Sequence, residues 1–210
     1  KKYQLLIPEL PGHNNDKFNS KFSLINYVNS IVLLILRNNL CNLFFFSHSV
    51  GGIIPILIAK RIKQKKKIKK FFNYEGNLTE YDTDTITKKT LSYNIKVFDK
   101  KFNKLVGICE QSSQSAIRLW SDSLKKTSSK AFYDLSKDTV MLSKKSILLS
   151  FFRIFFRRKL YMFGSNSLLN FSESFFGSER LILKNTGHFA FYDDKTKFLS
   201  VFLKLIYNCK

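Results

Sequence analysis

One serine stands where a short apolar strand is predicted to give way to an apolar helix. The segment Leu43–Ile54, with the sequence LFFFSHSVGGII, predicts a buried strand, a tight turn centred on Ser49, and a helix. Such a turn strains its central residue, so small residues are needed two positions before and after it, where Ser47 and Gly51 stand. The pattern is typical of a nucleophile elbow, in which Ser49 attacks a carbonyl carbon and the Val50 N–H stabilises the oxyanion. The alternative is an ordinary strand-to-helix turn whose glycines ease helix packing.

A nucleophilic serine needs a base whose pKa is near neutral, and the chain has three histidines. We predict that His188 is the base, because it follows the last expected strand, where a loop can return over the serine. His48 adjoins the serine and is expected either to pack or to contact substrate. His13 lies in an upstream loop that is expected to border the entrance to the site.

Three segments in the expected order carry a resemblance to the α/β-hydrolase superfamily. Ser47–Gly52 resembles the motif Gly-His-Ser-x-Gly-Gly, with Ser47 in place of the first glycine. Leu5–Asn15 is similar to the strand and loop that precede the elbow in that superfamily, and Leu181–Ala190 resembles its last strand and catalytic-histidine loop. An amphipathic stretch from Phe198 to Ile206 then resembles the terminal helix. The resemblance implies a serine, acid and histidine in that chain order, with no cofactor and no metal.

The acidic member of the expected triad is harder to assign. In most of the superfamily it follows the penultimate strand in a Gly-x-x-Asp pattern, but the corresponding stretch Gly164–Ser167 has no carboxylate. Some members place the acid one strand earlier, where this chain has Glu75. We therefore predict that Glu75 orients His188, while a solvated turn carboxylate is the alternative. Glu173 and Asp82 are lesser candidates.

Short apolar strands alternate with apolar-faced helices along the chain. This alternation predicts an α/β fold with a mostly parallel sheet and helices on both faces. Strands are expected at 2–7, 43–46, 68–74, 160–164 and 180–183, and helices at 20–37 and 50–62. The first helix is expected to start at Ser20 and to bury Phe22, Ile25, Val28, Ile31, Val32 and Ile35.

The pattern loosens in the middle of the chain, where the resemblance is thinnest and the superfamily inserts a cap. We predict a core formed by residues 1–78 and 157–210 and a helical cap over residues 79–156, with helices near 83–100, 113–124 and 143–156. Trp120 is expected either to line the substrate pocket or to pack the cap onto the core.

The resemblance also implies parts that the sequence does not contain. A second oxyanion donor normally lies in a His-Gly loop, which would precede Leu5, and a further strand normally lies between 2–7 and the elbow strand. The start at Lys1 therefore suggests an N-terminally truncated form of the superfamily.

The net charge of +21 raises the question of an anionic partner. Its densest cluster, Lys60–Lys70, falls at a helix end and strand start, and lysine is common throughout, so we expect no specific nucleic-acid partner. A second cluster of arginines lies among the phenylalanines of 151–156. It would touch a membrane surface or, as the favoured alternative, form a cap helix over an acyl pocket.

The remaining composition fits a single globular domain. No apolar run approaches the length of a membrane-spanning helix, and we find no signal-peptide pattern. The three cysteines, Cys41, Cys109 and Cys209, have no metal-like spacing and suggest a reducing compartment, hence a cytoplasmic location. Cys109 is expected to be a buried apolar residue. The oligomeric state is not predicted.

These observations predict a serine hydrolase that cleaves an ester, thioester or related acyl bond of a small apolar substrate. A dehalogenase is disfavoured because that chemistry needs a carboxylate nucleophile. The alternatives are a truncated or catalytically decayed homologue without turnover and, less favoured, a basic binding module.

Overall fold

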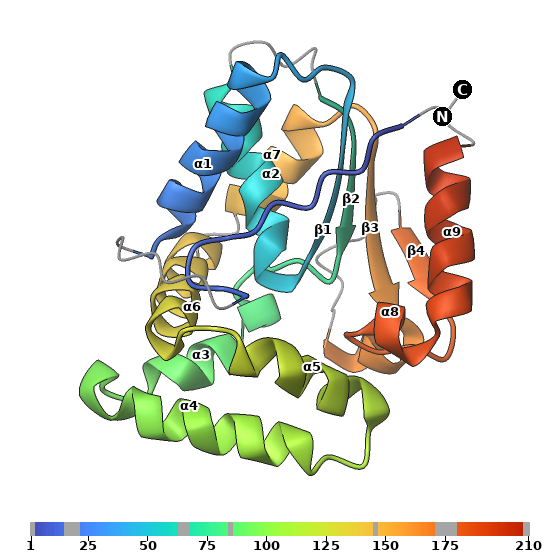
Figure 1. Ribbon diagram of the computed structural model, residues 1–210. Helices are drawn as coiled ribbons and strands as arrows, with labels where there is room; N and C mark the ends of the chain where they lie inside the picture. Colours follow the sequence, from blue (N-terminus) through green and yellow to red (C-terminus); the bar gives the residue numbers. More distant parts are fainter. Residues whose placement is uncertain are drawn as a thin grey trace.

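A four-stranded parallel sheet forms the centre of the protein (Figure 1). The computed structural model describes residues 3–14, 22–62, 68–83, 86–144, 147–170 and 180–207. The strands lie in chain order and are β1 (Leu43–His48), β2 (Ile68–Tyr74), β3 (Lys159–Gly164) and β4 (Arg180–Leu183). The predicted parallel α/β sheet is therefore confirmed.

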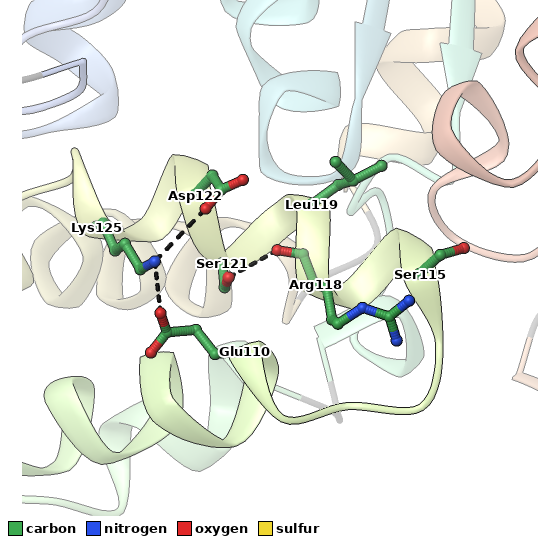
Figure 2. Close-up of a pocket in the computed structure, with 7 residues that line it drawn as sticks. All are labelled: Glu110, Ser115, Arg118, Leu119, Ser121, Asp122 and Lys125. Atoms are coloured by element: carbon green, nitrogen blue, oxygen red, sulfur yellow. Dashed lines mark hydrogen bonds and ion pairs between the residues drawn. The ribbon is translucent and has the colours of Figure 1, made fainter.

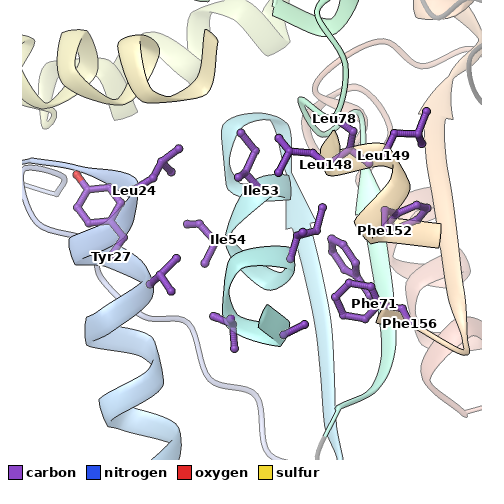
Figure 3. Close-up of a cluster of buried hydrophobic side chains, with 14 of the residues drawn as sticks. Leu24, Tyr27, Ile53, Ile54, Phe71, Leu78, Leu148, Leu149, Phe152 and Phe156 are labelled. Carbon is purple, nitrogen blue, oxygen red and sulfur yellow. The ribbon is translucent and has the colours of Figure 1, made fainter. Parts of the chain in front are cut away.

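Helices cover both faces of this sheet because successive strand residues point to opposite sides. On one face Phe71 and Tyr161 pack in the main core with α1 (Leu24–Arg37), α2 (Ile54–Arg61) and α7 (Ile147–Phe155) (Figure 3). On the other face Phe72, Tyr74 and Met162 pack against α9 (Lys195–Tyr207). Burial of two apolar sheet faces explains why the strand sequences are apolar almost throughout.

The N-cap of the first helix lies three residues later than predicted. Ser23 is the N-cap, and its side chain accepts a hydrogen bond from the Asn26 N–H at 3.1 Å, whereas Ser20 lies outside the described residues. The predicted burial of Val28 and Ile35 is confirmed. That of Ile25 is wrong: its side chain is 45% exposed, because the helix turns its neighbour Leu24 into the core instead.

The strand predicted at 2–7 is absent from the described part of that segment, so this prediction is wrong. Residues 3–10 carry no regular structure, and Leu5 and Ile7 are 71% and 79% exposed. The segment meets the sheet through Tyr3, whose ring lies 5.4 Å from that of Phe44. Without a neighbour to complete a hydrogen-bond ladder, an apolar run does not form a strand, and Pro8 removes a further donor. Among the described residues, β1 pairs with β2 alone.

Helices fill the long connection between β2 and β3. They are η3 (Tyr81–Thr83), α3 (Ile86–Leu91), α4 (Ile95–Glu110), α5 (Ser115–Lys125), α6 (Ser129–Ser143) and then α7. Side chains of α4, α5 and α6 form a cluster of their own, which contains Phe98, Phe102 and the buried, free Cys109. The predicted burial of that cysteine is confirmed.

The last of these helices packs on the sheet. The rings of Phe152 and Phe156 lie 5.4 and 4.8 Å from that of Phe71 on β2. These phenylalanines therefore fill the main core, and the expectation that they lie over an acyl pocket is wrong.

Three short elements complete the chain: η1 (Ser49–Ile53), η4 (Ser165–Asn170) and α8 (Ala190–Asp193). Of the helices described, none combines the length and apolar character needed to cross a bilayer.

Candidate functional site

The backbone turns sharply at Ser49, directly after β1. This residue has a φ of 53°, in the left-handed region that non-glycine residues rarely adopt, and it opens η1. Such a conformation costs on the order of 1–3 kcal/mol and persists only where surrounding structure enforces it. Part of that structure is the Asn77 N–H, which donates to the Ser49 carbonyl oxygen at 3.2 Å. The strained elbow backbone expected from the sequence is therefore present.

The two glycines of the elbow serve different purposes. A Cβ on Gly51 would meet only the Ser47 Cβ, at 4.0 Å, which is an ordinary contact. A Cβ on Gly52 would lie 2.5 Å from the Asn73 Oδ1 and 2.7 Å from the Gly76 Cα. The turn after β1 and the turn after β2 thus touch at Gly52. The steric requirement predicted for Gly51 thus falls on Gly52, through a contact that forms only when two strands lie side by side.

Glu75 follows β2 and is buried, with only 1% of its side chain exposed. Its φ is 44°, and its own N–H donates to the Met162 carbonyl at 2.9 Å. The two carboxylate oxygens have separate partners: Oε1 accepts from the Gly164 N–H at 2.9 Å, and Oε2 lies 2.7 Å from the His188 Nδ1. A buried carboxylate needs such partners, because an unpaired one would be strongly destabilising.

The loop that carries His188 is fixed by two hydrogen bonds at the preceding residue, Gly187. The Tyr74 hydroxyl donates to the Gly187 carbonyl at 2.6 Å, and the Asp193 Oδ2 accepts from the Gly187 N–H at 2.8 Å. Burial, assisted by the charge of Glu75, holds the pKa of Tyr74 well above its ordinary value, so its hydroxyl remains a donor. Neither Tyr74 nor Asp193 was among the residues predicted from the sequence.

His48 lies directly beneath this loop. Its Nε2 donates to the His188 carbonyl at 2.8 Å, and the two imidazole rings lie 4.4 Å apart. Burial, reinforced by the neighbouring His188, lowers the pKa of His48 to about 3, so His48 is neutral at physiological pH. The ring packs and holds the loop, which is one of the two roles expected for it.

Ser49, Glu75 and His188 come from three loops at the carboxyl ends of parallel strands. Among the described residues, no hydrogen bond joins the Ser49 hydroxyl to His188, although the preceding residue, His48, contacts His188. Val50 is the second residue of η1, where an N–H has no acceptor within its own helical turn.

The other sequence candidates have different surroundings. Asp82 Oδ2 accepts from the Leu78 and Thr79 N–H groups at 2.9 and 2.8 Å, so it stabilises the turn after β2. Glu173 lies outside the described residues. The His13 ring packs near Tyr27, 6.1 Å away, and its Nδ1 lies 3.2 Å from the Pro11 carbonyl.

Trp120 extends from α5 toward the histidine loop. Its ring lies 5.3 Å from that of Phe189, the residue next to His188. The inserted helices thus contact the loop that carries the candidate base.

A separate, open surface pocket of about 410 Å³ lies between α4 and α5 (Figure 2). Its wall carries Ser115, Arg118 and Leu119, and an ion pair between Lys125 and Glu110 crosses it. No group of three or more metal-ligating side chains occurs within the described ranges, either here or near Ser49.

Comparison with solved structures places this arrangement among known folds. The chain is similar to a carboxylesterase of the thaumarchaeon Nitrososphaera gargenis, with a TM-score of 0.69 and 13% identity over 94% of this chain and 77% of that one. It is also similar to an esterase from Exiguobacterium antarcticum, with a TM-score of 0.68 and 15% identity over 93% of this chain and 78% of that one. For MenH from S. aureus the TM-score is 0.70 and the identity 14%, over 95% of this chain and 82% of that one. No protein-family model matches the sequence, and no curated protein matches significantly.

The chain therefore has the α/β-hydrolase fold. At these identities the similarity concerns the fold. The chemistry at the ends of its strands depends on the residues placed there.

Proposed function

We propose that this protein is a serine hydrolase in which Ser49 is the nucleophile, His188 the general base and Glu75 the residue that orients the base. The observation that carries the proposal is the 2.7 Å contact between Glu75 Oε2 and His188 Nδ1, made by a carboxylate whose other oxygen is also engaged. That contact favours the tautomer that carries the proton on Nδ1, which leaves Nε2 as the acceptor that a serine hydroxyl requires.

The reaction follows from these roles. His188 Nε2 takes the Ser49 proton as the hydroxyl oxygen attacks the acyl carbon, and then returns that proton to the leaving group. Water attacks the acyl-enzyme in the second half of the cycle with the same base. Glu75 stabilises the imidazolium formed in each half, and the Val50 N–H stabilises the oxyanion.

The missing hydrogen bond between Ser49 and His188 is compatible with this role. Catalytic hydrogen bonds are often long or poorly aligned in free enzymes and tighten in the complex with substrate. The Asn77 N–H holds the Ser49 carbonyl and His48 holds the His188 carbonyl, and we propose that rotation of the two side chains closes the pair when substrate binds.

The substrate that fits best is a small apolar ester or thioester. We assign residues 79–156 to a cap over a core of 1–78 and 157–210, although α7 packs with the core. Trp120 and Phe189 would bound the acyl group beside the base. Esterases and an N-acyl homoserine lactonase are among the similar structures, which is consistent with hydrolysis of an acyl–oxygen bond. We further propose a cytoplasmic location, with no specific nucleic-acid partner and no cofactor.

A catalytically decayed homologue is the second candidate. It is favoured by Ser47, whose hydroxyl is buried without a partner where the superfamily motif has glycine. A buried hydroxyl without a hydrogen-bond partner next to this turn would shift the Ser49 backbone away from the geometry that catalysis needs.

Hydrolysis of p-nitrophenyl esters with two to eight acyl carbons separates these candidates. A serine hydrolase turns them over, and Ser49→Ala abolishes turnover while the matched control Ser47→Ala retains it. Absence of turnover in folded wild-type protein, together with gain of turnover in Ser47→Gly, would instead identify a decayed enzyme.

A further inference from the structure

Basic side chains gather at the edge of the sheet where the strands begin, opposite Ser49. In a parallel sheet the connecting helices run back along the strands, so the ends of α2 and α7 lie beside the starts of β2 and β3 (Figure 1). We call this surface the amino edge. Six of its exposed cations are Lys60, Arg61, Lys69, Arg153, Arg157 and Arg158.

Contacts across the amino edge show that these elements adjoin. The Lys60 ammonium lies 5.5 Å from the centre of the Phe151 ring on α7. The Phe71 N–H on β2 donates to the Arg158 carbonyl at 3.0 Å. Residues 63–67 of the basic stretch lie outside the described residues.

Acidic side chains occupy the opposite end of the molecule. Among the described residues, Glu75, Glu80 and Asp82 follow the carboxyl end of β2, and five more lie on α4, α5 and α6. Asp193 and Asp194 follow the histidine loop, and Glu9 lies in the segment whose Pro11 contacts the first turn of α1. None of these carboxylates is on the amino edge. Cations and carboxylates are therefore mixed at that end, whereas the described residues of the amino edge carry cations without carboxylates among them.

An exposed aliphatic residue stands within the cationic group. Ile154, in the last turn of α7, is 73% exposed and follows Arg153 in the sequence. Beside it, the rings of Phe151 and Phe155 stack 4.8 Å apart and are only partly buried. Cations surrounding an apolar tip suit a lipid interface, where the tip enters the acyl boundary and the cations meet the headgroups.

We propose that the amino edge is a docking surface for an anionic phospholipid membrane. The positive charge of this surface favours an anionic partner. The exposed side chain of Ile154 favours a bilayer over a nucleic acid, because a phosphate backbone offers no apolar layer. Docking in this way leaves the carboxyl ends of the strands, with Ser49 and His188, facing away from the bilayer. The proposal does not depend on the catalytic role of these residues.

Cosedimentation of the full chain with vesicles tests the proposal, using phosphatidylcholine with and without 30 mol% phosphatidylserine. Binding is expected only with phosphatidylserine and is expected to fall as salt is raised. Each cation near an anionic surface contributes about fivefold to partitioning. The triple variant Lys69→Gln, Arg157→Gln and Arg158→Gln is thus expected to bind on the order of a hundredfold more weakly, and Ile154→Ser roughly tenfold more weakly.

The matched control removes the same charge from the outer face of α4, through Lys96→Gln, Lys100→Gln and Lys104→Gln. It is expected to bind vesicles as the wild type does. Equal loss in both triple variants would overturn the proposal, because the attraction would then be diffuse. So would absence of binding to phosphatidylserine vesicles at low salt. Displacement by duplex DNA, with no effect of Ile154→Ser on vesicle binding, would assign the surface to nucleic acid instead.

Discussion

Replacing Glu75 by glutamine is expected to disable the base while leaving its surroundings in place. The carboxylate presents two acceptor oxygens, one to the Gly164 N–H at 2.9 Å and one to the His188 Nδ1 at 2.7 Å. A glutamine has a single acceptor oxygen. Because the Gly164 N–H requires that oxygen, the amide NH₂ of the variant turns toward His188 Nδ1 and stabilises the tautomer that carries its proton on Nε2.

That tautomer cannot accept the Ser49 proton. An orienting carboxylate replaced by its amide in a serine–histidine triad costs roughly 10⁴-fold in kcat, or about 5.5 kcal/mol of transition-state stabilisation. We expect Glu75→Gln to lower kcat by about 10³- to 10⁴-fold with little change in KM. The assay is steady-state hydrolysis of p-nitrophenyl butyrate, with folding checked by circular dichroism.

Asp82→Asn is the matched control. It makes the same chemical change in a nearby, partly buried carboxylate, which accepts from the Leu78 and Thr79 N–H groups and makes no hydrogen bond to His188. Its kcat is expected to stay within a few fold of the wild type. The reasoning is refuted if Glu75→Gln retains more than a tenth of wild-type kcat, or if the two variants lose activity equally.

Three further predictions concern stability and the proposed cap. Gly52→Ala is expected to lower the free energy of unfolding by about 2–4 kcal/mol in urea denaturation, since its Cβ would clash at 2.5 Å, while Gly51→Ala changes it by less than about 1 kcal/mol; equal effects would contradict this packing. Burial raises the pKa of Asp82 to about 6 and lowers that of His48 to about 3. Between about pH 4 and 6, Asp82 therefore carries a proton in the folded protein that it lacks in the unfolded chain, while His48 lacks a proton that it carries in the unfolded chain. The contributions of these two groups cancel in the wild type, and Asp82→Asn removes one of them, so the stability of the variant is expected to rise by about 1.4 kcal/mol per pH unit more steeply than that of the wild type; equal slopes in the two proteins would disprove the assignment. Trp120, the sole tryptophan, is expected to change its fluorescence when a phosphonate occupies Ser49, because its ring lies beside Phe189; an unchanged spectrum upon complete modification would place it outside the substrate pocket.

The strands next to the site could be predicted from the sequence because their apolar runs are short and bounded. The boundaries predicted for residues 68–74 and 180–183 agree with β2 and β4. The strained backbone at Ser49 was also predictable, since small residues, Ser47 and Gly51, lie two positions before and after it. The contact between Glu75 and His188 follows the predicted chain order, although 113 residues separate the two.

What the sequence did not reveal depends on contacts between distant segments. Helix α6 was missed because several of its buried positions are polar: Ser136 and Thr139 donate to carbonyls one turn earlier, and Ser143 donates to Asn77, so the apolar periodicity is weak. The strand at 2–7 was predicted from its apolar residues, but a strand also needs a partner. The supporting roles of Gly52 and Tyr74 arise only when neighbouring strands align their ends.

Mapping the adduct of a fluorophosphonate probe tests the central claim most directly, namely that His188, held by Glu75, activates the Ser49 hydroxyl. Peptide mass spectrometry after labelling of folded protein is expected to show one adduct, on Ser49, with labelling at least a hundredfold slower in His188→Gln. No adduct on Ser49, or equal labelling rates in the wild type and His188→Gln, would contradict the account.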